Sequence, residues 1–392
     1  MFADSTRSNI FAGDAVKAPF MAPRSKRPAA TSNKLVHVMT LGDEQPTNDK
    51  GEKKTHLMSI SYFPDGKQMV GGLTDNSARR WDLQTGEEIV EARIVCEREV
   101  WVVVVSKDSR WVVTGGGDSS RKDLCELKAC EVKTKMIKTF KGHLKGVTCI
   151  DVSVDNKLLA SGSEDHTAWI WDLNTGKLVA GPLECAGMVG AVRFSQDSKK
   201  LAVKSGGRCL EVWDIREQKL DRGVGKSGGG VFLDTPVFWT TEDRSIVAAF
   251  SFEDVHYPEF QGPTKIYEFD ASTLETVGAP FEAHTGGIRD LALSLDCALL
   301  ASASWDDTIK LWAFESRQLL ASFDVQHPFI LILSPNSRQL AYTTSGPSRI
   351  HICDIPPDIL ARIWPEQATC NVCIFTAYIY LLGTNSSVDH CA

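Results

Sequence analysis

Two segments of the sequence carry a histidine, a serine and an aspartate in the same order. The first set is His143, Ser161 and Asp165, and the second is His284, Ser302 and Asp306. These are the residue types of a nucleophilic catalytic triad, in which a carboxylate orients an imidazole and the imidazole activates a hydroxyl. Whether they do this chemistry depends on the elements that position them.

Those elements are copies of one repeated unit. GHLKGVTCIDVSVDNKLLASGSEDHTAWIWD begins at Gly142, AHTGGIRDLALSLDCALLASASWDDTIKLWA begins at Ala283, and the two align without gaps. In both copies the histidine precedes a tryptophan, Trp171 or Trp312, by 28 positions. Alternating apolar residues, an Asp-containing turn, a second short strand, an acidic turn and a third strand follow one another in each copy. Helical periodicity is absent, so the unit is predicted to be all β.

Weaker copies fill the intervals and bring the predicted number of units to seven. Their third strands are anchored at Trp81-Asp82, Cys130-Glu131, Trp171-Asp172, Trp213-Asp214, Phe269-Asp270, Trp312-Ala313 and Cys353-Asp354. Successive anchors lie 49, 41, 42, 56, 43 and 41 residues apart, so the two long intervals should contain insertions, in the longer one at 223–230 and 252–262. Strands this short must bury both faces against neighbours, which favours radially stacked four-stranded antiparallel blades.

The Gly142-His143 start, the Trp171-Asp172 end and the period resemble the WD-repeat family over residues 35–355. Units two and seven depart from the pattern, with cysteine where tryptophan is expected. The resemblance implies a seven-bladed β-propeller. It also implies that the N-terminal strand Leu35–Leu41 closes the last blade beside Arg349–Asp354, which leaves no open sheet edge there. The expected organisation is a disordered basic segment at 1–34, the propeller at 35–355 and a poorly specified tail at 356–392.

The same resemblance gives the histidines a structural role. In the family, the positions of His143, Ser161, Asp165 and Trp171 form a buried hydrogen-bond network, and His284, Ser302, Asp306 and Trp312 repeat it. Such a network satisfies every polar group in a low-dielectric interior. A catalytic site must be open to substrate. These two tetrads are therefore expected to stabilise blades and to do no catalysis.

The propeller rim is the expected contact face for a protein or peptide partner. Aligned with the family, the rim holds His56, Met58, Glu99, Trp101, Thr148, Glu164, Met188, Arg289, Trp305, His327 and Phe329. Trp, Met, Phe and Arg are enriched at interface cores, and large apolar groups on an exposed rim need an explanation. Local packing inside the channel is the alternative for Trp101 and Met58. Trp305 is the favoured contact residue.

Bulk composition narrows the function classes. A net charge of -7 makes nucleic-acid binding by the body of the protein unlikely. No apolar run reaches membrane-span length, and eleven scattered cysteines fit a reducing compartment, so a cytoplasmic or nuclear protein is expected rather than a secreted one. Cys370, Cys373, His390 and Cys391 are possible zinc ligands, but the apolar stretch between them is unlike a metal module. No metal and no cofactor are expected.

Three functions remain open. The leading hypothesis is a non-enzymatic scaffold that binds proteins at its rim. A second is a substrate receptor of a ubiquitin ligase, which requires the tail after Ile355 to contact an adaptor. The third is a propeller enzyme, for which His56, Glu99, Glu164 and His327 are the candidate acid, base or metal-binding residues. Convergence of these four side chains around one cavity separates the enzyme from the scaffold.

Overall fold

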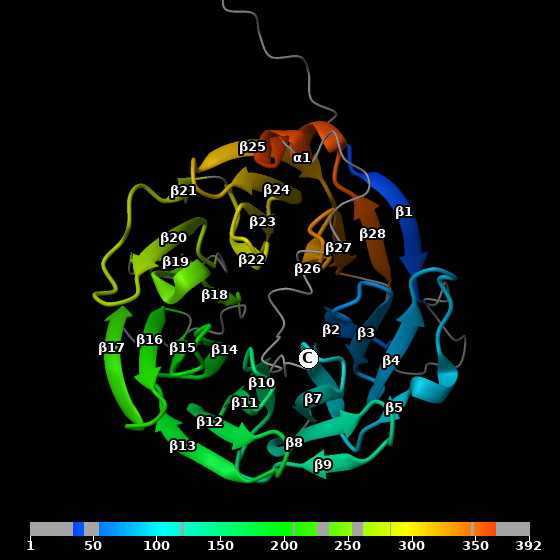
Figure 1. Cartoon of the computed structure of the whole chain (residues 1–392), viewed down its shortest axis with the longest axis vertical. Coiled ribbons are helices and arrows are strands. Elements are labelled where there is room, and N and C mark those ends of the chain that lie inside the picture. Colours follow the sequence, from blue (N-terminus) through cyan, green and yellow to red (C-terminus); the bar gives the residue numbers. More distant parts are fainter. Residues whose placement is uncertain are drawn as a thin grey trace, which may run out of the picture. The chain divides into compact units, whose positions relative to one another are not determined.

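The computed structural model describes residues 34–42, 55–118, 121–206, 208–225, 235–252, 262–282, 284–345 and 349–365, without the side chains of 121–123. Its strands form seven four-stranded antiparallel sheets arranged as the blades of a β-propeller (Figure 1), which confirms the predicted fold class. The predicted insertions fall mostly outside the described residues. Gly223 to Gly225, which the prediction assigned to an insertion, instead pair with the preceding strand of their blade.

The blades follow one another along the chain, and each runs from an inner strand at the ring centre to an outer strand. The first three blades comprise β2 Leu57–Tyr62, β3 Gln68–Leu73, β4 Ser77–Asp82 and β5 Ile94–Val95; β6 Glu99–Val105, β7 Trp111–Asp118, β8 Arg121–Glu131 and β9 Ile137–Thr139; and β10 Val147–Val152, β11 Leu158–Ser163, β12 Thr167–Asp172 and β13 Leu178–Glu184.

The remaining four blades keep this order until the last one. They comprise β14 Val189–Phe194, β15 Lys200–Ser205, β16 Cys209–Asp214 and β17 Lys219–Gly225; β18 Val237–Trp239, β19 Ser245–Phe250, β20 Lys265–Asp270 and β21 Phe281–Glu282; β22 Ile288–Leu293, β23 Leu299–Ser304, β24 Thr308–Ala313 and β25 Gln318–Asp324; and β26 Pro328–Leu333, β27 Gln339–Thr344, β28 Ile350–Asp354 and β1 Val36–Leu41. Short 3-10 turns lie at Val90–Ala92 and Thr241–Asp243.

Blade 7 is closed by the N-terminal strand, as predicted. Strand β1 pairs antiparallel with β28, with Leu41 opposite Ile350 and Val36 opposite Asp354. Figure 1 shows β1 at the perimeter beside β28. The two ends of the propeller sequence therefore share the sheet of blade 7, whose outer strand β1 is held by backbone hydrogen bonds to β28.

Buried apolar side chains hold each blade against the next. They form seven clusters, one at each junction between neighbouring blades. At the closing junction, Leu41 and Ile350 of blade 7 pack with Leu57 and Ile60 of blade 1. This arrangement explains why the strands alternate buried positions on both faces, since each blade contributes to two clusters.

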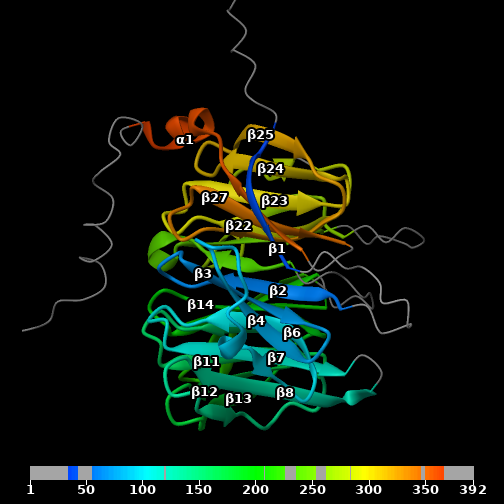
Figure 2. The same cartoon turned by 90° about the vertical axis from the view of Figure 1, so that its right-hand side faces the viewer.

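One helix, α1 (Pro357–Ile363), follows β28 and lies beside β24 and β25 (Figure 2). Its Ile359 is fully buried in the cluster between blades 6 and 7, and Leu360 and Ile363 pack against the same cluster. The first residues of the predicted tail are therefore attached to the propeller. The four residues between 370 and 391 that were weighed as possible zinc ligands, and the basic segment at 1–34 except for its last residue, lie outside the described residues.

Candidate functional site

The first His–Ser–Asp set lies inside blade 3, where hydrogen bonds join it to Trp171. His143 Nδ1 lies 2.9 Å from an Asp165 oxygen, and its Nε2 lies 2.8 Å from the Ser161 hydroxyl. The indole N–H of Trp171 donates to that hydroxyl at 3.0 Å. Asp165 also accepts the backbone N–H of Leu144 at 2.8 Å. The carboxylate thus connects the turn before β12 to the loop before β10.

Blade 6 repeats the arrangement. His284 Nδ1 lies 3.0 Å from Asp306 and Nε2 lies 2.7 Å from Ser302, which accepts the indole N–H of Trp312 at 3.2 Å. The backbone N–H of Thr285 donates to Asp306 at 3.0 Å. Both serines are fully buried, and neither tetrad contributes a side chain to the central cavity. Each serine hydroxyl is held between an imidazole and an indole, which is the geometry of a structural network.

The tetrads perturb the pKa values of their members. For Asp165, burial favours the neutral acid, but hydrogen bonds from His143 and Thr167 outweigh burial and hold the pKa of the carboxyl below its usual range. Burial lowers the pKa of His284, although the Asp306 carboxylate acts in the opposite direction. An ionised aspartate beside a neutral histidine therefore describes blade 6 at neutral pH.

Blades 2 and 4 replace the histidine with cysteine and the aspartate with a glutamate from the third strand. In blade 2, Glu126 accepts the backbone N–H groups of Glu97 and Arg98, both at 2.9 Å. In blade 4, Glu211 accepts the N–H of Ala186 at 3.2 Å and the Ser205 hydroxyl at 3.1 Å. These glutamates accept N–H groups of the loop before the inner strand, as Asp165 does, but from another sequence position. The repeat pattern does not reveal them, because its acidic residue lies in the turn before the third strand.

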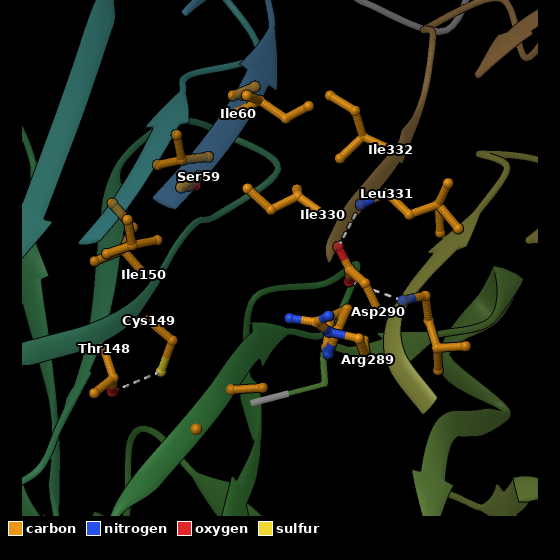
Figure 3. A pocket seen from close by; sticks show the side chains of 18 of the residues that line it. Ser59, Ile60, Thr148, Cys149, Ile150, Arg289, Asp290, Ile330, Leu331 and Ile332 are labelled. Atoms are coloured by element: carbon orange, nitrogen blue, oxygen red, sulfur yellow. Dashed lines mark hydrogen bonds between the residues drawn. The ribbon is translucent and has the colours of Figure 1, made fainter. Parts of the chain in front are cut away.

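A cavity of about 1000 Å³ occupies the centre of the ring, lined by the inner strands of the blades (Figure 3). Eight of the predicted rim residues line it: Met58, Trp101, Thr148, Glu164, Met188, Arg289, Trp305 and Phe329. Three do not: His56, Glu99 and His327. The cavity wall also contains residues that sequence reasoning missed, among them Arg193, Phe238 and Asp290. They sit within inner strands, where only the alternation of the strand signals which side chains face the ring axis.

Two predicted rim residues turn out to be mainly packing groups. Glu99 is only 8% exposed, because its carboxylate turns inward and accepts the indole N–H of Trp101 at 3.1 Å. The indole of Trp101 lies over Gly146 of the next blade so closely that a Cβ there would lie 2.1 Å from the ring. The prediction that Glu99 lies exposed on the rim is therefore wrong. Trp101 lines the cavity and packs two blades together.

The most distinctive group on the cavity wall is a set of three side chains from blades 6 and 7, which we call the Arg289 clamp: Arg289, Trp305 and Phe329. The Arg289 guanidinium carbon lies 3.7 Å from the centre of the Trp305 ring and 4.5 Å from that of Phe329. Trp305 is 45% exposed, whereas Arg289 is only 6% exposed. Burial lowers the pKa of Arg289 to about 10. This value is still well above neutral pH, so the guanidinium is charged.

Asp290, next to Arg289, serves the junction between blades 6 and 7. Its carboxylate accepts the backbone N–H of Leu331 at 2.6 Å, which can be followed in Figure 3, and that of Leu291 at 2.8 Å. Burial raises the pKa of Asp290 to about 7, against the lowering effect of these donors and of Arg289. Asp151 makes the corresponding bond to the N–H of Phe194 at 2.8 Å. Inner-strand carboxylates thus satisfy N–H groups on the inner strand of the following blade.

The four candidate catalytic residues do not gather around the cavity. Only Glu164 lines it, while His327 pairs with Asp307 at 3.1 Å and Glu99 turns to Trp101. Among the residues that the structure describes, no group of three or more His, Cys, Asp or Glu side chains has a metal-binding arrangement. The geometry that would favour the enzyme hypothesis is not present at these residues.

Comparison with known proteins agrees with the repeats seen in the fold. Residues 134–172 and 275–313 match the family model "WD domain, G-beta repeat", and these stretches end with the third strands of blades 3 and 6. The chain is 23% identical over 269 residues to the LEC14B protein of Lithospermum erythrorhizon. It is 28% identical over 194 residues to eukaryotic translation initiation factor 3 subunit I of Culex quinquefasciatus. It is 22% identical over 270 residues to cell division cycle 20.1, cofactor of APC complex, of Arabidopsis thaliana.

These matches cover 68%, 48% and 67% of this chain and 53%, 58% and 55% of the three relatives, respectively. The chain therefore spans little more than half the length of these curated relatives. In the described part of the chain, no helix has the length and apolar character needed to cross a membrane.

Proposed function

Because this chain is a WD-repeat β-propeller, we propose that it is a non-enzymatic scaffold whose cavity rim binds a protein or peptide partner. The observation that carries the proposal is the Arg289 clamp. Trp305 presents nearly half of its surface beside a charged guanidinium at the mouth of a central cavity. Tryptophan and arginine are the residues most enriched among interface positions with large energetic contributions.

The relatives support this class of function by name, since one is a subunit of a translation initiation factor and another a cofactor of a complex. The ubiquitin-ligase alternative needs the segment after Ile355 to contact an adaptor. In the described part of that segment, the apolar side chains of α1 pack onto blades 6 and 7. We therefore favour the scaffold. We further propose that it works in the cytoplasm or nucleus, on the basis of its scattered cysteines.

The test is affinity purification of the tagged full chain from cells. Wild type is compared with Trp305→Ala and with Trp305→Ala plus Arg289→Ala. Val95→Ser serves as the control, because Val95 is an exposed apolar residue on the outer strand of blade 1. We expect the rim variants to lose partners that the control retains, with melting temperatures that show a folded propeller. Rim variants that keep every wild-type partner would refute the assigned face.

A further inference from the structure

Among the residues that the structure describes, the cation of the Arg289 clamp forms no salt bridge, although the neighbouring Asp290 acts on its charge. The Nη1 group donates to the Ser345 hydroxyl at 2.9 Å, while the buried Nε has no hydrogen-bond partner among the described residues. In the same part of the chain, no carboxylate makes a salt bridge with this guanidinium. The adjacent Asp290 is committed to the backbone of β22 and β26.

A buried guanidinium without a salt bridge is unfavourable unless an anion binds to it. Removing a guanidinium from water costs free energy, and cation–π contacts with Trp305 and Phe329 offset only part of that cost. By contrast, Arg193 on the same cavity wall has an ion-pair partner, Asp151, at 3.1 Å. The described lining of the cavity thus contains one guanidinium with a salt bridge and one without, and only the latter contacts two aromatic rings.

We propose that the Arg289 clamp binds the carboxylate of an Asp or Glu side chain within an extended segment of a partner protein. This inference rests on the proposed function and names the chemistry of the partner. Among the described residues, Nη1 donates to Ser345 and Nε is buried without a partner, which leaves Nη2 to donate to a carboxylate oxygen of the bound segment. Trp305 and Phe329 fix the plane of the guanidinium, so it loses little further freedom on binding.

The surroundings favour a carboxylate on a peptide over a phosphate group. The clamp supplies a single cation, and Asp307 and Glu164 on the same rim would repel a dianion. Met58, Trp101 and Met188 line the same cavity, so a segment that inserts an acidic side chain would also find apolar contacts. A free small anion would gain only the ion pair.

The experiment selects binders for the full-length protein from a phage-displayed library of random peptides. We expect Asp or Glu to be enriched at one fixed position of the selected peptides. The best peptide is synthesised with that residue as Glu and as Gln. Wild type should bind the Glu peptide at least about tenfold more tightly than the Gln peptide, and added salt should reduce the difference. Arg289→Gln should bind both equally, and Arg289→Lys should restore part of the preference.

The outcomes separate this inference from the proposed function. Peptides that lose binding to Trp305→Ala but bind wild type equally with Glu or Gln would leave the rim as the binding face and overturn the carboxylate assignment. Selected peptides that bind Trp305→Ala as well as wild type would count against both. The comparison of Glu with Gln peptides is made on wild type, so it stands even if the Arg289 variants fold poorly. A preference for phosphoserine over Glu at the fixed position would also overturn the assignment.

Discussion

At the scale of single residues, the three residue types of a hydrolase site here form a buried hydrogen-bond network that fixes loops to strands. Asp165 accepts hydrogen bonds from an imidazole, a threonine hydroxyl and a backbone N–H at once, and these bonds hold the pKa of its carboxyl below the usual range. The serine hydroxyl is occupied on one side by His143 and on the other by Trp171. Each group is therefore satisfied by the fold, and none faces the cavity.

Removing the carboxylate should cost stability. Asp165→Ala leaves His143 and the Leu144 N–H without their shared acceptor in a buried place, so we expect the free energy of unfolding to fall by about 1–3 kcal/mol. Urea denaturation measures this change. Rim binding, measured at a temperature where the variant is folded, should be unaffected. Loss of partner binding in fully folded Asp165→Ala would contradict a purely structural role.

The tetrad of blade 6 should also make stability depend on pH. Because the pKa of His284 is lowered in the fold, the unfolded chain binds a proton at this residue more readily. Its contribution to stability is complete above the unfolded pKa of about 6.5 and is lost as pH falls from there towards the folded value. The gap in unfolding free energy between wild type and His284→Gln should therefore narrow by on the order of 1 kcal/mol between pH 7.5 and 5.5. A gap that stays constant would show that His284 has no lowered pKa.

At the scale of elements, close packing between neighbouring blades stabilises the propeller. Gly146, just before β10, lies under the Trp101 indole of the preceding blade, and an added Cβ would lie 2.1 Å from it. Gly146→Ala should therefore push the ring aside and destabilise the protein by about 1–3 kcal/mol. Gly223→Ala is the matched control, because its Cβ would meet only Leu220 at 3.9 Å. Adding Trp101→Val to Gly146→Ala removes the indole and should relieve the clash. Thermal melting of wild type, Gly146→Ala, Gly223→Ala and the double variant tests this.

Element order was largely predictable from the sequence. The fixed spacing from His143 to Trp171 and from His284 to Trp312 located two blades, and the alternation of Leu35–Leu41 identified the closing strand. The substitutes in blades 2 and 4 were not predictable in this way, because Glu126 and Glu211 reach the same N–H groups from the third strand. A motif records a residue at a position, whereas the fold requires only an acceptor at a point in space.

The cavity wall was predictable only in part. Arg289, Trp305 and Phe329 were each expected at the rim, but nothing in the sequence showed that the arginine would be buried between the two rings, since they come from different turns and blades. Glu99 was placed on the exposed rim by alignment, yet it points to Trp101 instead. Contacts made across blade junctions depend on the curvature of the ring, which no single repeat contains.

At the scale of the whole molecule, the seven apolar junctions make a closed ring whose rigidity keeps the Arg289 clamp in place. The clamp residues come from two adjacent blades, so a segment bound there would contact both the turn at 305–307, between β23 and β24, and the start of β26.

Hydrogen–deuterium exchange on a complex tests the central claim most directly. The partner is the protein most depleted from the Trp305→Ala purification, expressed and bound to wild type. Binding at the rim predicts slower exchange at residues 304–307 and 327–330, with the outer strands β5, β9 and β13 unchanged. Protection confined to the outer strands or to α1, with the residues around Trp305 and Phe329 exchanging as in the free protein, would contradict the account.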